Sequence, residues 1–95
     1  MAQQGQVGRV ATTVKAGDGG YTRVTYHSTH VVTFSDHEVI LNSGGWRTQT
    51  TKTRMNQASN QFGLGFRVSQ RNHDWFVQVP GVGEVPFVDG MAFAR

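Results

Sequence analysis

Alternating apolar and polar residues run along most of the chain and predict β-strands on both sides of one central interruption. This period of two residues is typical of strands with one buried face, and glycine-rich or polar turns separate the runs. The predicted strands cover residues 9–15, 21–27, 30–35, 38–42, 64–68, 75–79, 85–88 and 91–93. Because the turns are short, we expect neighbouring strands to pair antiparallel.

The second half of the chain shows the clearest alternation. Large apolar side chains there occupy every second position, so they are expected to face the core. These positions are Leu64, Phe66, Val68, Trp75, Val77 and Val79. Pro86 lacks a backbone N–H, which predicts an edge position for the strand over 85–88.

The interruption predicts a single helix over about residues 50–61. An apolar stripe at helical spacing marks its buried side and consists of Met55, Ala58 and Phe62, with Thr51 on the same side of the helix. A threonine hydroxyl at position 48, 50 or 51 is expected to cap the first turn, and Gly63 to end the helix. The other side is polar and is expected to be exposed, with Lys52, Asn56, Gln57, Asn60 and Gln61 on it.

These elements predict an α+β fold in a single domain. We expect one sheet of six or seven mostly antiparallel strands, with the helix inserted after the third or fourth strand. A lone helix with one apolar stripe must pack on a sheet face. Residues 1–8 are rich in Gln and Gly and are expected to be flexible. Exposed sheet edges favour pairing between copies, so a homo-oligomer is expected.

Composition narrows the setting of the protein. The chain has 95 residues and no cysteine, which excludes disulfides and thiolate metal sites. Its start has neither a basic segment nor an apolar core of a signal peptide. Nor does it contain the ~20 consecutive apolar residues that a membrane-spanning helix needs. The sequence thus predicts a cytoplasmic protein without a membrane partner.

The distribution of charge is more informative than the formal net charge of +3. No acidic residue occurs from Val39 through His73. The same segment contains the basic residues Arg47, Lys52, Arg54, Arg67 and Arg71. Arginine forks bind phosphate bidentately, so this acid-free segment favours an anionic ligand. A solvated positive face without a ligand is the alternative.

Anion-binding groups are densest at the predicted helix start. Free N–H groups, hydroxyls and cations at a helix N-terminus form a cradle for phosphate. The candidate ligand-binding residues are Trp46, Arg47, Thr48, Thr50, Lys52 and Arg54, with Asn56 and Arg67 as flanking contacts. Trp46 is expected either to stack on a base or to pack in the core. A nucleotide-hydrolysing loop is excluded, because Thr51 stands where such a loop needs glycine before its lysine.

Other candidate chemistry is weaker. His27 and His30 are an odd interval apart, so on one strand they point to opposite faces and do not form a zinc site with His37. Ser28 and Ser35 lie near histidines but lack the strand–turn–helix context of a catalytic serine. We therefore expect no catalytic residue, no metal and no cofactor.

Several segments resemble a group of small tailed-phage (bacteriophage) accessory proteins. The resemblance spans roughly residues 21–91 and rests on Tyr26-His27-Ser28-Thr29, residues 31–34, Leu41-Asn42-Ser43-Gly44-Gly45-Trp46-Arg47-Thr48, residues 50–52, residues 54–57 and Pro86-Phe87-Val88-Asp89-Gly90-Met91. It implies a product made in an infected bacterium. Such products bind host proteins, nucleic acids or the nucleotide signals of host defence, and the resemblance assigns no site residues.

Two functional hypotheses follow. The preferred one is a non-enzymatic phage accessory protein that binds a phosphorylated ligand at the helix N-terminus. The ligand class is a nucleotide or a nucleic acid backbone, including a host defence signal that the protein antagonises. The alternative is a protein–protein interaction module, either a homo-oligomeric virion component or an inhibitor of a host protein.

Overall fold

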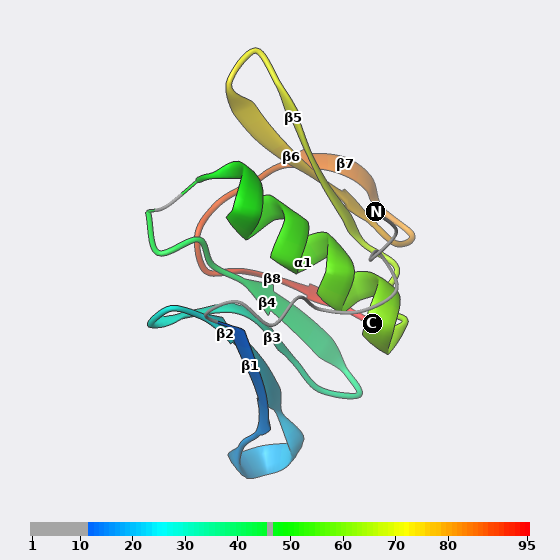
Figure 1. Ribbon diagram of the computed structural model, residues 1–95. Helices are drawn as coiled ribbons and strands as arrows, with labels where there is room; N and C mark the ends of the chain where they lie inside the picture. Colours follow the sequence, from blue (N-terminus) through cyan, green and yellow to red (C-terminus); the bar gives the residue numbers. More distant parts are fainter. Residues whose placement is uncertain (1–11, 46) are drawn as a thin grey trace.

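The computed structural model describes residues 12–45 and 47–95, which form strands, a short 3-10 turn over Asp18–Gly20 and an α-helix (Figure 1). The elements in chain order are β1 (Thr12–Ala16), β2 (Thr22–Tyr26), β3 (Thr29–Phe34), β4 (Glu38–Leu41), α1 (Gln49–Phe62), β5 (Arg67–Arg71), β6 (Asp74–Val79), β7 (Gly83–Pro86) and β8 (Met91–Ala94). All strand pairs are antiparallel. The α+β class and a helix that follows the fourth strand are confirmed.

The prediction of one six- or seven-stranded sheet is wrong. Five strands form one sheet in the order β1-β2-β3-β4-β8, and three form a second sheet in the order β5-β6-β7. After β7 the chain returns to the first sheet, where the Gly90 N–H donates to the Leu41 carbonyl at 2.8 Å. Local alternation predicts that a strand exists, but it carries no information on which distant strand it joins.

A β-bulge explains a second difference from the expected pattern. Val24 pairs with Val32, whereas Thr25 pairs with His30, so β3 has one extra residue, Val31, at this point. The bulge turns Val31 inward, and both Val31 and Val32 are buried although they are neighbours in sequence. Simple alternation places Val31 on the opposite face.

Both ends of α1 are as the sequence predicts. The Thr51 N–H donates to Thr48 Oγ1 at 3.2 Å, so Thr48 caps the first turn. Gly63 has φ 65°, and its N–H returns to the Ser59 carbonyl. On the side of the apolar stripe, Thr51, Met55 and Ala58 are buried, and Phe62 packs partly buried against the core.

Only part of the polar side of α1 is exposed as expected, because the helix has neighbours on two sides. Asn60 and Gln61 are exposed, whereas Lys52 and Asn56 are half-buried. Gln57 is only 2% exposed, and Ser59 is 3% exposed. The helix packs on β2 and β3 of the first sheet and also against β5 of the second (Figure 1). Among the described residues, every buried side-chain nitrogen and oxygen atom has a hydrogen-bond partner. The contact between α1 and β5 is therefore polar, and its buried side-chain atoms are hydrogen-bonded.

Asn56 makes the principal contact between α1 and β5. Its Nδ2 donates to the Val68 carbonyl at 3.0 Å, and its Oδ1 accepts from the Val68 N–H at 2.7 Å. A neighbouring strand would make the same pair of bonds. One helical turn later, Ser59 Oγ donates to the Phe66 carbonyl at 2.7 Å. The helix thus covers the edge of β5 that no described strand pairs with.

The buried apolar residues of both sheets belong to one cluster, which includes all six positions predicted for the second half of the chain. Edge-to-face ring contacts join distant segments: Trp75 to Phe87 with centroids 5.4 Å apart, and Phe66 to Phe93 at 5.8 Å. The first pair holds the segment after β7 against β6, and the second pair links β8 to the segment before β5.

Edge positions and chain ends complete the comparison with the sequence. Pro86 lies in β7 at an edge of the second sheet, as predicted. The predicted flexible segment 1–8 lies outside the described residues, as do residues 9–11 of the first predicted strand, and β1 begins at Thr12. No helix in the described part of the chain is long and apolar enough to cross a membrane.

We predict that Asn56→Asp lowers the free energy of unfolding by about 2 kcal/mol, because the donor to the Val68 carbonyl is lost and that carbonyl then faces a carboxylate. Urea unfolding at pH 7 measures the loss. Asn42→Asp is the matched control, since Asn42 Oδ1 only accepts a bond, from the Gly44 N–H at 2.7 Å. Equal losses in both variants would contradict the assigned role of Asn56.

Candidate functional site

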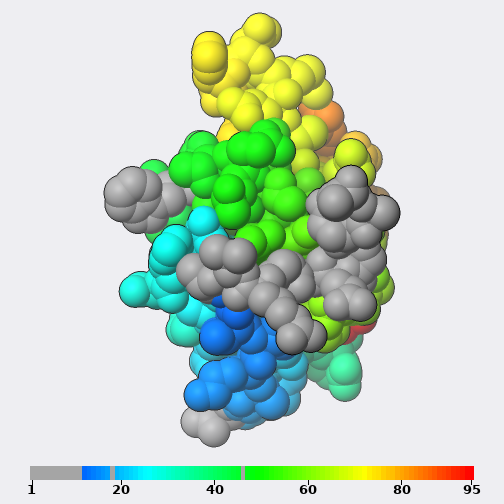
Figure 2. All heavy atoms as spheres, viewed as in Figure 1, coloured from blue at the N-terminus to red at the C-terminus, as the bar shows by residue number. Residues whose placement is uncertain are grey.

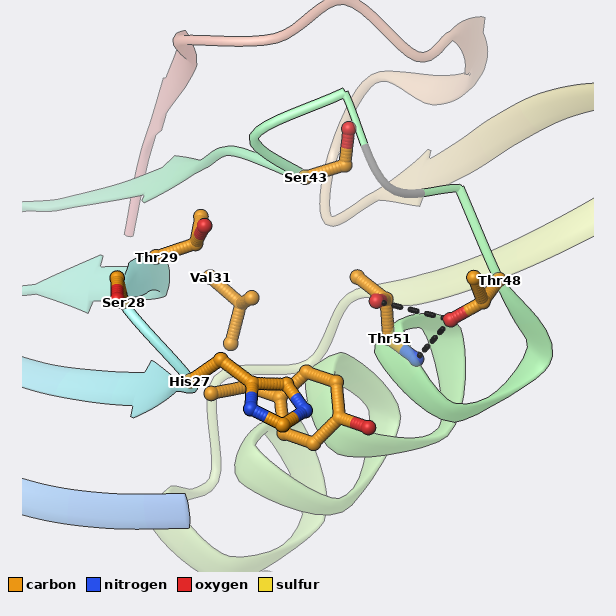
Figure 3. A pocket seen from close by; sticks show the side chains of 8 residues that line it. His27, Ser28, Thr29, Val31, Ser43, Thr48 and Thr51 are labelled. Carbon is orange, nitrogen blue, oxygen red and sulfur yellow. Dashed lines mark hydrogen bonds between the residues drawn. The ribbon is translucent and has the colours of Figure 1, made fainter. Parts of the chain in front are cut away.

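A pocket of about 360 Å³ lies at the N-terminal end of α1 (Figure 3). It lies between the turn that joins β2 to β3, the segment after β4 and the first turn of the helix. Its lining residues are Tyr26, His27, Ser28, Thr29, Val31, Ser43, Thr48 and Thr51. No acidic side chain is among them, so the lining is compatible with an anion.

Two threonines form the helical wall of the pocket. Thr48 Oγ1 accepts the Thr51 N–H, and the two hydroxyl oxygens are 3.1 Å apart (Figure 3). One hydroxyl donates to the other, which leaves the remaining hydroxyl hydrogen able to donate to a ligand. Thr48 Oγ1 takes up the Thr51 N–H, and the remaining N–H groups of the first turn, which have no acceptor within the helix, favour negative charge at this end.

The β2–β3 turn forms the opposite wall. His27 has φ 57°, and its exposed ring lies 4.4 Å from the Tyr26 ring, tilted by 56°. Gly44 holds this turn close to the segment before the helix, because a Cβ there would lie 2.4 Å from Thr29 Oγ1. Its φ of 63° also favours glycine. The glycine thus allows the segment after β4 to approach Thr29 at the start of β3.

Ser43 is held in place by Asp89, a residue near the C-terminus. Its N–H and its hydroxyl both donate to Asp89 Oδ1, each at 2.7 Å, and the residue is 1% exposed. Ser43 Oγ also accepts the Gly45 N–H at 3.2 Å. The carboxylate of Asp89 therefore orders the backbone that leads from β4 toward the helix.

The predicted basic cradle does not form around one point. Arg47 reaches toward Asp89, with Nη2 and Oδ2 3.8 Å apart, and its guanidinium lies 5.0 Å from the Phe87 ring centroid. Lys52 Nζ donates to Gln70 Oε1 at 3.3 Å. These two cations link the start of α1 to different neighbouring segments, and neither lines the pocket.

Arg54 is the predicted cation that contacts a wall of the pocket. Its guanidinium lies 5.6 Å from the ring centroid of Tyr26, a lining residue. Nε donates to Thr12 Oγ1 at 2.9 Å, and Nη1 donates to Gln57 Oε1 at 3.2 Å. These bonds hold the positive charge near the Tyr26 ring, where it raises the electrostatic potential of the pocket.

The other predicted site residues are dispersed. Thr50 is exposed in the first turn of α1, and the Asn56 amide is engaged by the backbone of Val68. Arg67 is exposed and alternates with buried Val68, so it lies on the outer face of the second sheet, away from the core. Trp46 lies outside the described residues.

The outer face of the second sheet has its own charge pair. Arg71 donates to both carboxylate oxygens of Glu84, at 3.0 and 2.5 Å, and lies 4.3 Å from the Phe76 ring centroid. The hydrogen bonds from Arg71 lower the pKa of Glu84. Because a carboxylate neutralises this arginine, Arg71 is not a free cation for phosphate.

Sequence reasoning missed most of the pocket. Ser28, Thr29 and Ser43 are small polar residues in turns, and their convergence depends on the pairing of β2 with β3 and on Asp89. A histidine metal site finds no support: within residues 12–45 and 47–95 no group of three His, Cys, Asp or Glu side chains could hold a metal ion. His30 instead lies with Nδ1 2.8 Å from Thr25 Oγ1.

The fold and the pocket define a small α+β domain with a hydroxyl-lined cavity at the helix start. Residues 1–94 match the family model of the Kyanoviridae Gp96 protein, and the chain belongs to this phage protein family. The resemblance to small tailed-phage proteins is thereby confirmed. No curated protein and no solved structure is significantly similar to the chain.

We predict that Asp89→Ala lowers the free energy of unfolding by about 2 kcal/mol, because it leaves the buried N–H and hydroxyl of Ser43 without an acceptor. Asp89→Asn keeps an amide oxygen in place and is expected to cost less than about 1 kcal/mol. Thermal unfolding followed by circular dichroism compares the two variants. If they are equally destabilised, the acceptor role of Asp89 is wrong.

Proposed function

We propose that this protein is a non-enzymatic phage accessory protein that binds a phosphorylated ligand, a nucleotide or a nucleic acid backbone, in the pocket at the start of α1. The observation that carries the proposal is a cavity that lies at a helix N-terminus and is lined by hydroxyl groups. Its volume of about 360 Å³ is within the range of small-molecule sites.

The donors suit a phosphate group. Thr48, Thr51 and the Ser28–Thr29 turn supply hydroxyls from both walls, and the exposed ring of His27 supplies an N–H at the rim. Phosphate oxygens are strong acceptors, and a helix N-terminus favours negative charge. The aromatic rings of Tyr26 and His27 offer a surface on which a base can stack.

The site proposed here differs in its ligand contacts from the site expected from the sequence. Thr48 is again a direct contact in the proposed site, and Arg54, next to the Tyr26 ring, acts as a source of positive potential. Arg47 and Lys52 instead position the helix start through Asp89, Phe87 and Gln70. The ligand contacts proposed here are therefore mainly hydroxyls rather than arginine forks.

Membership of a phage family supports a setting in the infected bacterium. A phage product that sequesters a phosphorylated compound in the host cytoplasm would remove a nucleotide signal of host defence or shield a nucleic acid. Either role needs binding without turnover. The proposal therefore assigns no catalytic residue to the pocket.

We expect the protein purified from infected bacteria and then denatured to release a phosphorylated compound, detected by mass spectrometry and ultraviolet absorbance. The emptied and refolded protein would then bind that compound again in a calorimetric titration. A folded protein that releases no such compound, and that binds neither ATP nor a single-stranded oligonucleotide used as probes, would contradict the proposal.

We predict that Ser28→Asp weakens binding of the released compound, or of the probe that binds, by at least about tenfold. A carboxylate in the pocket would repel phosphate at short range. Ser28→Asn has nearly the same shape without the charge and serves as the matched control. Equal affinities of the two variants would exclude a phosphate group near Ser28.

A further inference from the structure

The sheets have four edges, and three of them are protected against pairing with another chain. Asn56 and Ser59 of α1 cover β5. Pro86 and exposed Glu84 interrupt β7, and exposed Lys15 lies on β1. Proline, charge and cover are the usual means by which proteins block an edge strand. β8 occupies the fourth edge and has none of them within Met91–Ala94.

Hydrogen bonds at both borders of β4 show which groups of β8 face outward. Toward β3, the Ser35 N–H donates to the Glu38 carbonyl at 2.9 Å. Toward β8, the Arg95 N–H donates to the His37 carbonyl at 3.0 Å. Backbone groups of successive residues alternate between the two sides of a strand. The backbone groups of Phe93 and Arg95 therefore face β4, whereas the Met91 N–H donates to the Val88 carbonyl at 3.0 Å.

It follows that Ala92 and Ala94 direct their N–H and C=O groups away from β4, toward the open edge. Both residues are exposed, and the described strands leave β8 as the last strand of its sheet. Their methyl side chains carry no charge and little bulk. Nothing in β8 itself opposes the approach of another strand.

We propose that β8 pairs antiparallel with β8 of a second copy of this chain, which joins two five-stranded sheets into one continuous sheet. A two-fold axis through Phe93 places Ala92 opposite Ala94 of the other copy. In this register every outward N–H and C=O group of both alanines finds a partner. The interface is thus self-complementary.

Side chains also fit this register. Phe93 is only partly buried against the core, and it lies opposite its own copy in a close, non-hydrogen-bonded pair. Arg95 lies opposite Met91 of the other copy, so the axis brings no like charges directly together. The pairing uses no residue of the pocket and is independent of the proposed ligand.

Sedimentation equilibrium of the full chain tests the pairing. We expect a species of twice the 10.5 kDa chain mass, and Ala94→Pro is expected to weaken its formation at least about tenfold. Proline removes an N–H that faces outward, so the β4–β8 ladder keeps its bonds. Ala94→Ser retains the N–H and is the matched control.

A second variant covers the case in which Ala94→Pro does not fold. The double change Ala92→Lys and Ala94→Lys leaves the backbone intact and places like charges side by side across the axis, which should also yield monomers. A wild-type protein that stays monomeric up to about 1 mM would overturn the proposal. So would a dimer that persists in the folded lysine variant.

Discussion

The two-point hydrogen bond between Asn56 and the backbone of Val68 is the interaction on which the arrangement of this domain depends. It joins the helix α1, which also packs on the first sheet, to the edge strand β5 of the second sheet. Without it, β5 would expose or bury an unpaired N–H and C=O, and both outcomes carry a cost. Ser59 extends the same edge by one more bond. A helix here completes a β-sheet with its side chains.

This double attachment also places the N-terminus of the helix. The helix α1 is held by β2 and β3 on one side and by β5 on the other. In Figure 2 its green surface lies between the cyan surface of the β2–β3 segment and the yellow surface of β5. Arg47, Lys52 and Arg54 each tie that end to a different segment. The pocket results from this placement, since its other wall is the two-residue turn between the paired strands β2 and β3.

Sequence patterns predict the elements of this fold much better than their assembly. The helix, a threonine cap at its start, the Gly63 stop and the inward side chains from Leu64 to Val79 follow from local sequence signals, and all are confirmed. The return of β8 to β4, the Val31 bulge and the burial of Gln57 depend on contacts between distant residues. Thr48 is predicted as a ligand contact because it belongs to the local signals of the helix start. Ser43 is not predicted, because its place in the pocket depends on the distant residue Asp89.

The most direct test of the proposed site is a two-dimensional amide NMR titration of the full chain with ATP, inorganic phosphate and a single-stranded oligonucleotide. The account predicts concentration-dependent shifts for Ser28, Thr29, Thr48 and Thr51, which line both walls of the pocket, and none for exposed Val82. Shifts confined to the outer face of the second sheet around Arg67, or no shifts with any of the three probes, would contradict it.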